Sequence, residues 1–143
     1  MTCHARVIAQ LREAGVRLTP QRAMVLEALF HHPGHATVEE VHRRVQAQSP
    51  YVDLSTVYRT LALLKRQGVV GELHVEGQPA RYEAVRAEMD HHHAVCSRCG
   101  RILEVAPTAL DALREELLTA HGFHAHLVHC CIPGLCAECA AAT

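Results

Sequence analysis

Two Cys-x-x-Cys pairs constrain the fold of this chain more than any other feature of its sequence. The first pair is Cys96 and Cys99, the second is Cys136 and Cys139, and 36 residues separate them. Each pair can present two thiolates from one tight turn, so two such turns complete the tetrahedral sulfur coordination of structural zinc. A thioredoxin-like site would need a pair that opens a helix after a strand, and a c-type haem would need a histidine directly after the second cysteine. The pattern therefore predicts structural zinc, with an iron–sulfur centre or a redox pair as alternatives.

The composition supports metal chemistry in the same region. The 143 residues include 7 cysteines and 13 histidines, and six of the cysteines and seven of the histidines lie between residues 91 and 139. No apolar run approaches the ~18 residues of a membrane span, and residues 1–10 lack the pattern of a secretory signal. We therefore expect a cytoplasmic protein with no membrane partner, whose reduced cysteines serve metal or redox chemistry rather than disulfides.

Charge divides the chain in two. Residues 1–85 carry ten Lys and Arg against eight Asp and Glu, whereas residues 86–143 carry four against seven. Because the acidic part is also the part rich in cysteine and histidine, the two regions are expected to have different roles. We place the boundary in the polar stretch near 85–90, which gives one domain over 1–85 and a second over 86–143.

Helix signals and a hairpin signal follow one another in the first domain. A Thr-Pro step at 19–20 favours a helix start, and 37–40 is a capping box in which a glutamate follows a threonine by three residues. Apolar spacing predicts a further helix over about 54–67. Two short strands are expected at 69–75 and 80–85. Short helices followed by a hairpin indicate a winged helix-turn-helix.

The outer face of the helix predicted over 54–67 suits a DNA major groove. Hydroxyls near its N-terminus can bind phosphates, a tyrosine can contact a thymine methyl group, and an arginine can bind a guanine edge. The segment alone also fits an ordinary amphipathic helix with a solvated face, and a formal net charge of −1 is low for a DNA-binding protein. Its place between other helices and a hairpin favours DNA binding. The predicted DNA contacts are Ser55, Thr56, Tyr58 and Arg59.

The second domain is predicted to combine strands with one helix. Strands are expected at 91–95, 101–105 and 123–132, and a helix over 107–120. The helix is expected to turn Leu110, Leu113, Leu117 and Leu118 inward. Cys130 and Cys131 have no metal-ligand spacing, and we interpret them as small core residues.

The histidine run 91–93 is interpreted through strand geometry, because alternate residues of a strand share a face. His91 and His93 then point the same way and form half of a metal site, while His92 points away. Glu104 on the adjacent strand and Glu83 at the end of the hairpin could add carboxylates. Nitrogen and oxygen donors suit Fe(II), Mn(II) or Zn(II), although the run also fits a polar strand that binds nothing.

Together these segments resemble the ferric uptake regulator (Fur) family of bacterial metal-sensing repressors, from about Val16 to Cys139. The segments that carry the resemblance are Leu18–Arg22, Ser55–Leu61, Arg81–Glu83, His91–Gly100 and Gly134–Cys139. The resemblance implies a homodimer of α+β class. Its N-terminal winged helix-turn-helix would bind double-stranded operator DNA, and its small α/β domain would dimerise and hold the structural zinc.

The resemblance also implies a regulatory metal between the two domains. Its ligands would be His35, Glu83, His91, His93 and Glu104. A further metal site of the family would fall at Asp90, His92, Asp111 and position 128, where this chain has a valine that cannot ligate and where His126 or His129 could substitute. His31, His32, His42 and His74 match no ligand position and are interpreted as surface residues.

We therefore predict a metal-dependent DNA-binding repressor rather than an enzyme. No cysteine lies between His4 and Val95, whereas zinc sensors of the family often place one near the hinge, so Fe(II) or Mn(II) is favoured over Zn(II) as the effector. Peroxide sensors of the family typically carry aspartate at the position of Glu104, which weighs against peroxide sensing. The rival classes are a metal-buffering protein that uses the histidines and an oxidoreductase that uses one Cys-x-x-Cys pair.

Overall fold

The computed structural model describes residues 3–85, 91–127 and 130–142. The chain folds into two compact units, one formed by Met1–His74 with Pro79–Ala87 and the other by Val75–Gln78 with Glu88–Thr143. Each unit combines helices with a three-stranded sheet, as expected for the α+β class. Among the described residues, no helix is both long enough and apolar enough to cross a membrane.

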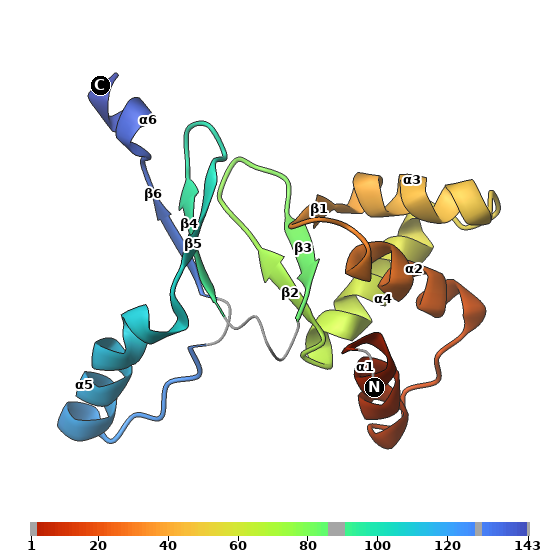
Figure 1. Cartoon of the computed structure of the whole chain (residues 1–143), viewed down its shortest axis with the longest axis horizontal. Coiled ribbons are helices and arrows are strands. Elements are labelled where there is room, and N and C mark those ends of the chain that lie inside the picture. The colour runs from red at the N-terminus through yellow and green to blue at the C-terminus, as the bar shows by residue number, and fades with distance from the viewer. Residues whose placement is uncertain (1–2, 86–90, 128–129, 143) are drawn as a thin grey trace. The chain divides into compact units, whose positions relative to one another are not determined.

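The N-terminal unit packs helices against a small antiparallel sheet of order β1-β3-β2 (Figure 1). Its elements are α1 (Cys3–Glu13), α2 (Pro20–Phe30), β1 (Ala36–Thr37), α3 (Val38–Gln48), α4 (Leu54–Arg66), β2 (Val70–Leu73) and β3 (Arg81–Ala84). The core of this unit is aliphatic, and its most buried members include Leu11, Leu26, Leu29, Val41, Leu61 and Leu64. A packed core of this kind fixes where α4 and the hairpin β2–β3 present their outer faces.

Side-chain caps fix where three of these helices begin. Thr19 accepts the backbone N–H three residues on at 3.3 Å, and proline follows it at the first turn of α2. Thr37 and Glu40 form the predicted capping box, with bonds of 2.8 and 3.3 Å. Asp53 accepts the N–H of Thr56 at 2.8 Å and begins α4. Each cap satisfies an N–H that has no partner within its helix, so the predicted helix starts are confirmed.

The two ends of α4 are tied down by local contacts. At its C-terminus Gly68 has a φ of +72° and its N–H donates to Lys65, while the N–H of Val69 donates to Leu64. This pair of bonds is a Schellman motif, which requires the left-handed conformation that glycine adopts at low cost. Before the helix, Nε2 of His42 on α3 lies 2.9 Å from the carbonyl oxygen of Val52. His42 is therefore not the simple surface residue that the sequence suggested, because it braces the turn that leads into α4.

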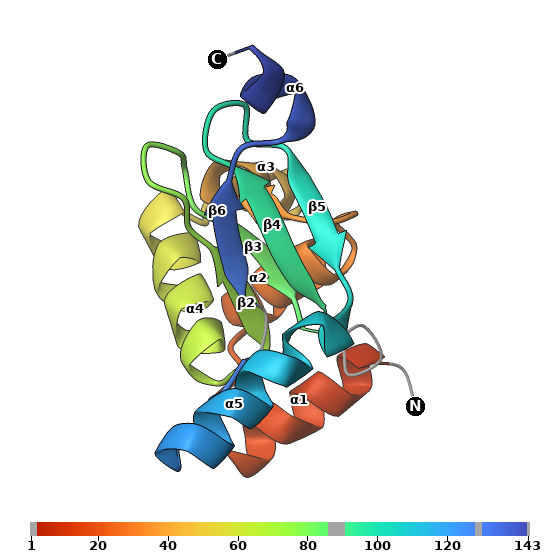
Figure 2. The same ribbon diagram turned by 90° about the vertical axis from the view of Figure 1, so that its left-hand side faces the viewer.

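The C-terminal unit is built on a mixed sheet of order β5-β4-β6, with β4 in the middle (Figure 2). Its elements are β4 (His92–Cys96), β5 (Ile102–Val105), the 3₁₀ turn η1 (Pro107–Leu110), α5 (Asp111–His121), β6 (Cys131–Gly134) and α6 (Ala137–Ala141). β4 pairs antiparallel with β5 and parallel with β6. The central strand thus lies between β5, which follows it closely in sequence and runs antiparallel to it, and β6, which is distant in sequence and runs parallel to it.

The predicted strand over 123–132 is wrong in its position. Residues 123–127 form no helix or strand, and the strand begins only at Cys131 and runs to Gly134. Pro133 lies inside this strand rather than ending it. β6 is an edge strand, and proline is tolerated there because one row of its backbone groups needs no ladder partner.

The helix expected over 107–120 is present in two parts, η1 and α5, but its burial differs from the prediction. Leu113 and Leu118 are each 45% exposed, and Leu110 and Leu117 are only half-buried. The expectation of an inward apolar face is therefore wrong for the single chain. Apolar periodicity predicts that one face of a helix is buried. It does not predict whether the face is buried by the same chain or by another protein copy.

Candidate metal and nucleic-acid sites

The four cysteines of the two Cys-x-x-Cys pairs converge in the C-terminal unit. Cys96 and Cys99 flank the turn between β4 and β5, whereas Cys136 and Cys139 lie at the start of and within α6. Their sulfur atoms all lie within 4.8 Å of one another, and the Cys99 and Cys136 sulfurs are 3.8 Å apart. The cluster has the donor type and number of a structural zinc site. These four cysteines could therefore hold one zinc ion.

The surroundings of the four thiols favour negative charge at one of them. Backbone N–H groups, first that of Cys136 and then that of Cys99, lower the pKa of Cys96 to about 5. Side-chain hydrogen bonding, first with Cys136, raises the pKa of Cys139 to about 12. One thiolate is therefore already stabilised by the fold, and a divalent cation would allow the remaining thiols to lose their protons.

Arginine side chains connect the two cysteine pairs from outside. Arg101 on the β4–β5 side donates two hydrogen bonds of 3.0 Å to the carboxylate of Glu138 in α6. Arg98 donates to the carbonyl oxygen of Cys139 at 2.7 Å. These bonds hold α6 against the turn, so the second pair of cysteines is positioned by contacts that the spacing of the cysteines could not reveal.

A histidine and a carboxylate meet in the N-terminal unit. Nε2 of His35 lies 3.0 Å from Oε2 of Glu83, and both side chains are about nine-tenths buried. The contact depends on β1, whose pairing of Ala36 with Tyr82 places His35 opposite Glu83 at the end of the ladder. Two buried side chains that can bind a metal, His35 and Glu83, are therefore held together by a strand of only two residues.

A second group of donors lies on the sheet of the C-terminal unit. The rings of His91 and His93 meet edge to face with centroids 4.5 Å apart, which confirms that they share one face of β4. His93 is fully buried. Glu104 pairs with His93 across β4 and β5, so it extends from the same face, although it is exposed. The five residues that the resemblance implied thus fall into two groups, one in each unit.

The further metal site implied by the resemblance is not formed by the described residues. Asp90, Val128 and His129 lie outside the described ranges. His92 is almost fully buried, and its Nδ1 accepts the N–H of Cys130 at 3.3 Å. Asp111 is exposed and forms an ion pair with Arg114 in the first turn of α5 at 2.8 Å. Within the described part of the chain, neither His92 nor Asp111 belongs to a group of three or more metal-binding side chains.

The predicted DNA contacts lie on the outer side of α4. Ser55 and Arg59 are exposed, Tyr58 is 48% exposed and Thr56 is half-buried. The Arg59 guanidinium lies 3.4 Å from the Thr56 hydroxyl, which holds both near the N-terminal half of the helix. The turn before α4 also exposes Tyr51, which the sequence analysis missed and which is 94% exposed.

The electrostatics at the start of α4 depend on its capping residue. Hydrogen bonds from Thr56, then from Ser55, hold the pKa of Asp53 below its usual value of 3.8, and the charge of Arg59 adds to the effect. The carboxylate therefore stays ionised and occupies the helix N-terminus itself. Phosphate groups would have to bind beside it, through the exposed hydroxyl and guanidinium groups of the following turn.

Comparisons with known proteins agree with this architecture over nearly the whole chain. Residues 13–132 match the ferric uptake regulator family. The peroxide operon regulator of Bacillus subtilis (strain 168) is 35% identical over 129 residues, which cover 90% of this chain and 88% of that protein. The ferric uptake regulation protein of Synechococcus elongatus is 30% identical over 137 residues, covering 94% and 93%. A structure of the ferric uptake regulator from Pseudomonas aeruginosa with manganese superposes with a TM-score of 0.74 at 25% identity, covering 90% and 96%.

Proposed function

Because this chain belongs to the ferric uptake regulator family of metal-responsive transcriptional regulators, we propose that it is a homodimeric repressor whose binding to operator DNA requires Fe(II) or Mn(II). The relatives named above include both a peroxide regulator and a ferric uptake regulator, so the family alone leaves the signal open. The proposal assigns Cys96, Cys99, Cys136 and Cys139 to structural zinc.

The observation that carries the proposal is the division of the donors between the two units. His35 and Glu83 are held 3.0 Å apart in the N-terminal unit, and His91 and His93 contact each other on the sheet of the C-terminal unit, with Glu104 beside them. One ion can take ligands from both groups in one relative orientation of the units only. Metal binding would therefore stabilise that orientation by its differential affinity for it.

The orientation matters because DNA is read by two copies of α4. In a dimer, fixing each winged helix also fixes the distance between the two reading helices, which must match half-sites one or more helical turns apart, ~34 Å per turn. Ser55, Thr56, Tyr58 and Arg59 are the assigned DNA contacts. The exposure of Ser55, Tyr58 and Arg59 on α4 supports this assignment.

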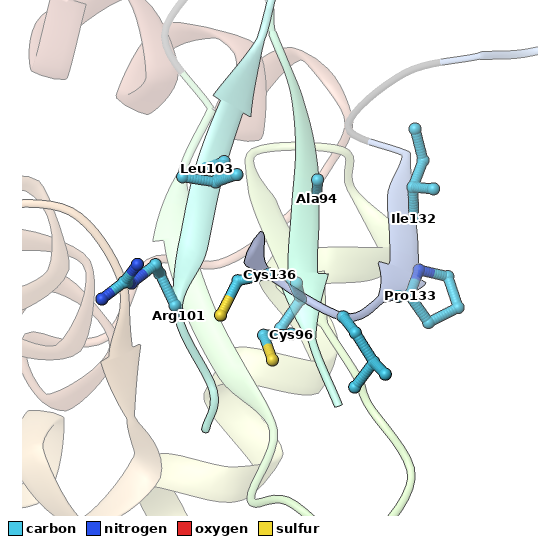
Figure 3. Close-up of a pocket in the computed structure, with 10 residues that line it drawn as sticks. Ala94, Cys96, Arg101, Leu103, Ile132, Pro133 and Cys136 are labelled. Atoms are coloured by element: carbon cyan, nitrogen blue, oxygen red, sulfur yellow. The ribbon is translucent and has the colours of Figure 1, made fainter. Parts of the chain in front are cut away.

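The apolar face of the C-terminal sheet supports a homodimer. Leu103, Ala94 and Ile132 form a row across β5, β4 and β6, on the face opposite to Glu104 and His93. Leu103 is 52% exposed and Ile132 is 40% exposed. Beside them a cavity of about 100 Å³ reaches towards Cys96 and Cys136 (Figure 3). Such a contiguous apolar surface is typical of an interface, and we assign it to the second copy.

The test is operator binding at controlled free metal concentrations. A binding sequence is first selected from a random DNA library with the metal-loaded dimer. Binding of that sequence is then measured against Fe(II), Mn(II), Zn(II) and Co(II), with the parent protein and with His91→Ala and His35→Ala. We expect both variants to keep one zinc per chain and remain dimers, yet to lose the metal-dependent gain in affinity. A His91→Ala protein that responds to metal over the parent's concentration range would overturn the assignment.

The rival readings give different outcomes in the same experiment. A metal-buffering protein would take up metal without sequence-specific DNA binding, and an oxidoreductase would leave at least one cysteine pair without zinc and open to thiol reagents. A peroxide-responsive repressor, which the Bacillus relative brings into consideration, would lose DNA binding when hydrogen peroxide is added to its Fe(II) or Mn(II) form at a fixed metal concentration. We expect reversible, metal-controlled binding in both forms.

A further inference from the structure

The turn of the hairpin β2–β3 belongs to a different unit from the strands that it joins. β2 ends at Leu73 and β3 begins at Arg81, both in the N-terminal unit, whereas Val75–Gln78 between them belong to the C-terminal unit. The turn is closed by a backbone hydrogen bond of 3.0 Å from the N–H of Gln78 to the carbonyl oxygen of Val75. The tip of the hairpin is therefore held by contacts outside the hairpin itself.

The side chain of Gln78 makes such contacts. Its Nε2 atom donates to the carbonyl oxygen of Cys96 at 3.1 Å and to that of Ser97 at 3.3 Å. An amide nitrogen carries two N–H groups, so it can serve both acceptors at once. Gln78 is half-buried, and Cys96 is one of the four cysteines of the zinc cluster. The hairpin tip is thus bonded to the backbone of a zinc-binding turn in the same unit.

The two acceptor carbonyls are positioned by the turn that presents the first cysteine pair. The carbonyl oxygen of Cys96 also accepts the N–H of Gly100 at 2.9 Å, and the N–H of Ser97 donates to Gly134 on β6 at 2.8 Å. The same turn places the sulfur atoms of Cys96 and Cys99 in the cluster. Because metal binding and folding are coupled at such sites, a turn that rearranges on zinc loss would move both acceptors of Gln78.

We propose that Gln78 is a positioning residue that anchors the tip of the β2–β3 hairpin on the zinc-binding turn, so that zinc in the four-cysteine cluster restrains the DNA-binding unit as well as stabilising its own unit. The inference deepens the proposed function and rests on it for the consequence for DNA binding. The anchor itself does not depend on which metal regulates the protein.

The anchor matters because of how the chain connects the two units. The chain passes from one unit to the other at the two ends of the turn Val75–Gln78, and once more between residues 87 and 88. A body attached at one point can rotate in every direction, whereas a body attached at two points can turn only about the line that joins them. With the turn fixed by Gln78, the N-terminal unit has two points of attachment. Fewer orientations are then open to it, which lowers the ordering cost of metal and DNA binding.

The coupling between zinc and the turn acts in both directions. If zinc favours the anchored turn, the anchored turn must favour zinc binding by the same factor. Two hydrogen bonds of ordinary net strength change such an equilibrium roughly 5–30-fold. A residue that only shaped its own turn would alter the turn without altering zinc retention. Zinc retention is therefore the measurement that separates an anchor from a local structural role.

The experiment compares Gln78→Ala with Glu76→Gln, which changes an exposed side chain of the same turn and keeps the two bonds of Gln78. Each full-length protein is filled with one zinc per chain. Hydrogen exchange gives the protection of the amide of residue 78, with the amide of Val85, which donates to Val69 in the N-terminal unit, as internal reference. A chelator dye gives the zinc affinity. In Gln78→Ala we expect protection and zinc affinity each to fall roughly 5–30-fold, whereas Glu76→Gln should stay within about twofold of the parent.

A second variant separates lost hydrogen bonds from lost packing. Gln78→Glu restores the size of the side chain but supplies no N–H donor, and its carboxylate would face two carbonyl oxygens. We expect it to lose at least as much protection and zinc affinity as Gln78→Ala. If Gln78→Glu behaved like the parent, packing rather than hydrogen bonding would hold the turn, and the assignment to the two carbonyls would be wrong. Parent-like protection and zinc affinity in both variants would likewise overturn the anchor.

Operator binding tests the consequence for the DNA-binding unit. In Gln78→Ala the Mn(II) concentration at half-maximal operator binding should rise by about the same 5–30-fold factor, while the protein keeps its zinc in the absence of chelator and remains a dimer. An unchanged Mn(II) response, together with lost protection, would overturn the restraint on the DNA-binding unit. Failure of the proposed function is a different result, because His91→Ala would then keep the parent's metal response. Hydrogen exchange and zinc affinity would still decide the anchor in that case, since neither measurement involves DNA or the regulatory metal.

Discussion

Nε2 of His35 lies 3.0 Å from Oε2 of Glu83, although 47 residues separate them in the sequence. A strand of only two residues creates this contact, because β1 pairs with Arg81 and Tyr82 on β3. Both side chains are about nine-tenths buried. A buried histidine next to a buried carboxylate is held in one orientation before any metal binds, which lowers the ordering cost of binding.

Replacing Glu83 should weaken the regulatory site without affecting the zinc site. Glu83→Gln keeps the shape of the side chain but removes its charge, so we expect Mn(II) affinity to fall roughly 10–100-fold. Metal-dependent operator binding should shift to higher metal concentration by the same factor. The control is Glu72→Gln, which changes a carboxylate on the adjacent strand β2 that pairs with Lys65 instead. Equal Mn(II) affinity in the two variants would remove Glu83 from the ligand set.

Loss of one zinc thiolate should destabilise the C-terminal unit. We expect Cys96→Ser to lose zinc, because one of the four thiolates is removed, and backbone N–H groups lower the pKa of that thiol in the fold. Metal binding is coupled to folding, so loss of zinc should lower the melting temperature and dissociate the dimer. Cys130→Ser, which removes a cysteine outside the four-thiol cluster, should keep both. Elemental analysis and calorimetry on the two variants provide the test, and a Cys96→Ser protein with full zinc would contradict the assignment.

Acid should weaken α4 through its capping residue. Hydrogen bonds from Thr56 and Ser55 lower the pKa of Asp53 below 3.8 in the folded protein. The ionised cap therefore stabilises the fold fully above that unfolded value, and this contribution is lost as the pH falls through the lower folded pKa. Asp53→Ala should melt below the parent at pH 7, and the difference should shrink at pH values under 3.8.

Asp53→Asn is the control for that experiment. Asparagine caps helices about as well as aspartate and does not titrate, so this variant should melt near the parent at pH 7 and show no contribution of this kind to the pH dependence. If the gap between parent and Asp53→Ala stayed constant down to strongly acidic pH, the ionised form of Asp53 would not be what stabilises the helix.

The features that sequence predicted well are those encoded within a few residues. Caps at Thr19 and Thr37 each act within three positions, and the paired Cys-x-x-Cys spacing carries its own geometry. The features that it missed depend on distant pairing. β1 is too short to have a pattern, and the register of Cys131 with His93 follows from a parallel crossover. The exposed leucines of α5 show a third limit, since an apolar face has the same pattern whether its cover comes from this chain or from another copy.

A charge on the apolar face of the C-terminal sheet should break the dimer. Ile132→Asp places a carboxylate in the row formed with Ala94 and Leu103, where we assign the second copy. Desolvating that charge at an interface would be costly, so sedimentation should show monomers that keep their zinc. Ala47→Asp adds the same charge at an exposed position of α3 and should remain a dimer. A dimeric Ile132→Asp protein would place the interface elsewhere.

The last prediction concerns how DNA is read. Arg59 is exposed on α4 and lies 3.4 Å from the hydroxyl of Thr56. If Arg59 binds a guanine edge, Arg59→Ala should cost ~1–3 kcal/mol on the selected operator and relax the sequence preference at one position. If it contacts only phosphate, affinity should fall alike on all sequences, and the slope of log affinity against log salt should become shallower by about one unit.

Arg43→Ala, which removes an exposed arginine on α3, serves as the control. Binding is measured by fluorescence anisotropy over a series of salt concentrations, with metal present in excess. Unchanged binding by both Arg59→Ala and Tyr58→Ala, in proteins that keep metal and dimer, would show that α4 does not read the operator.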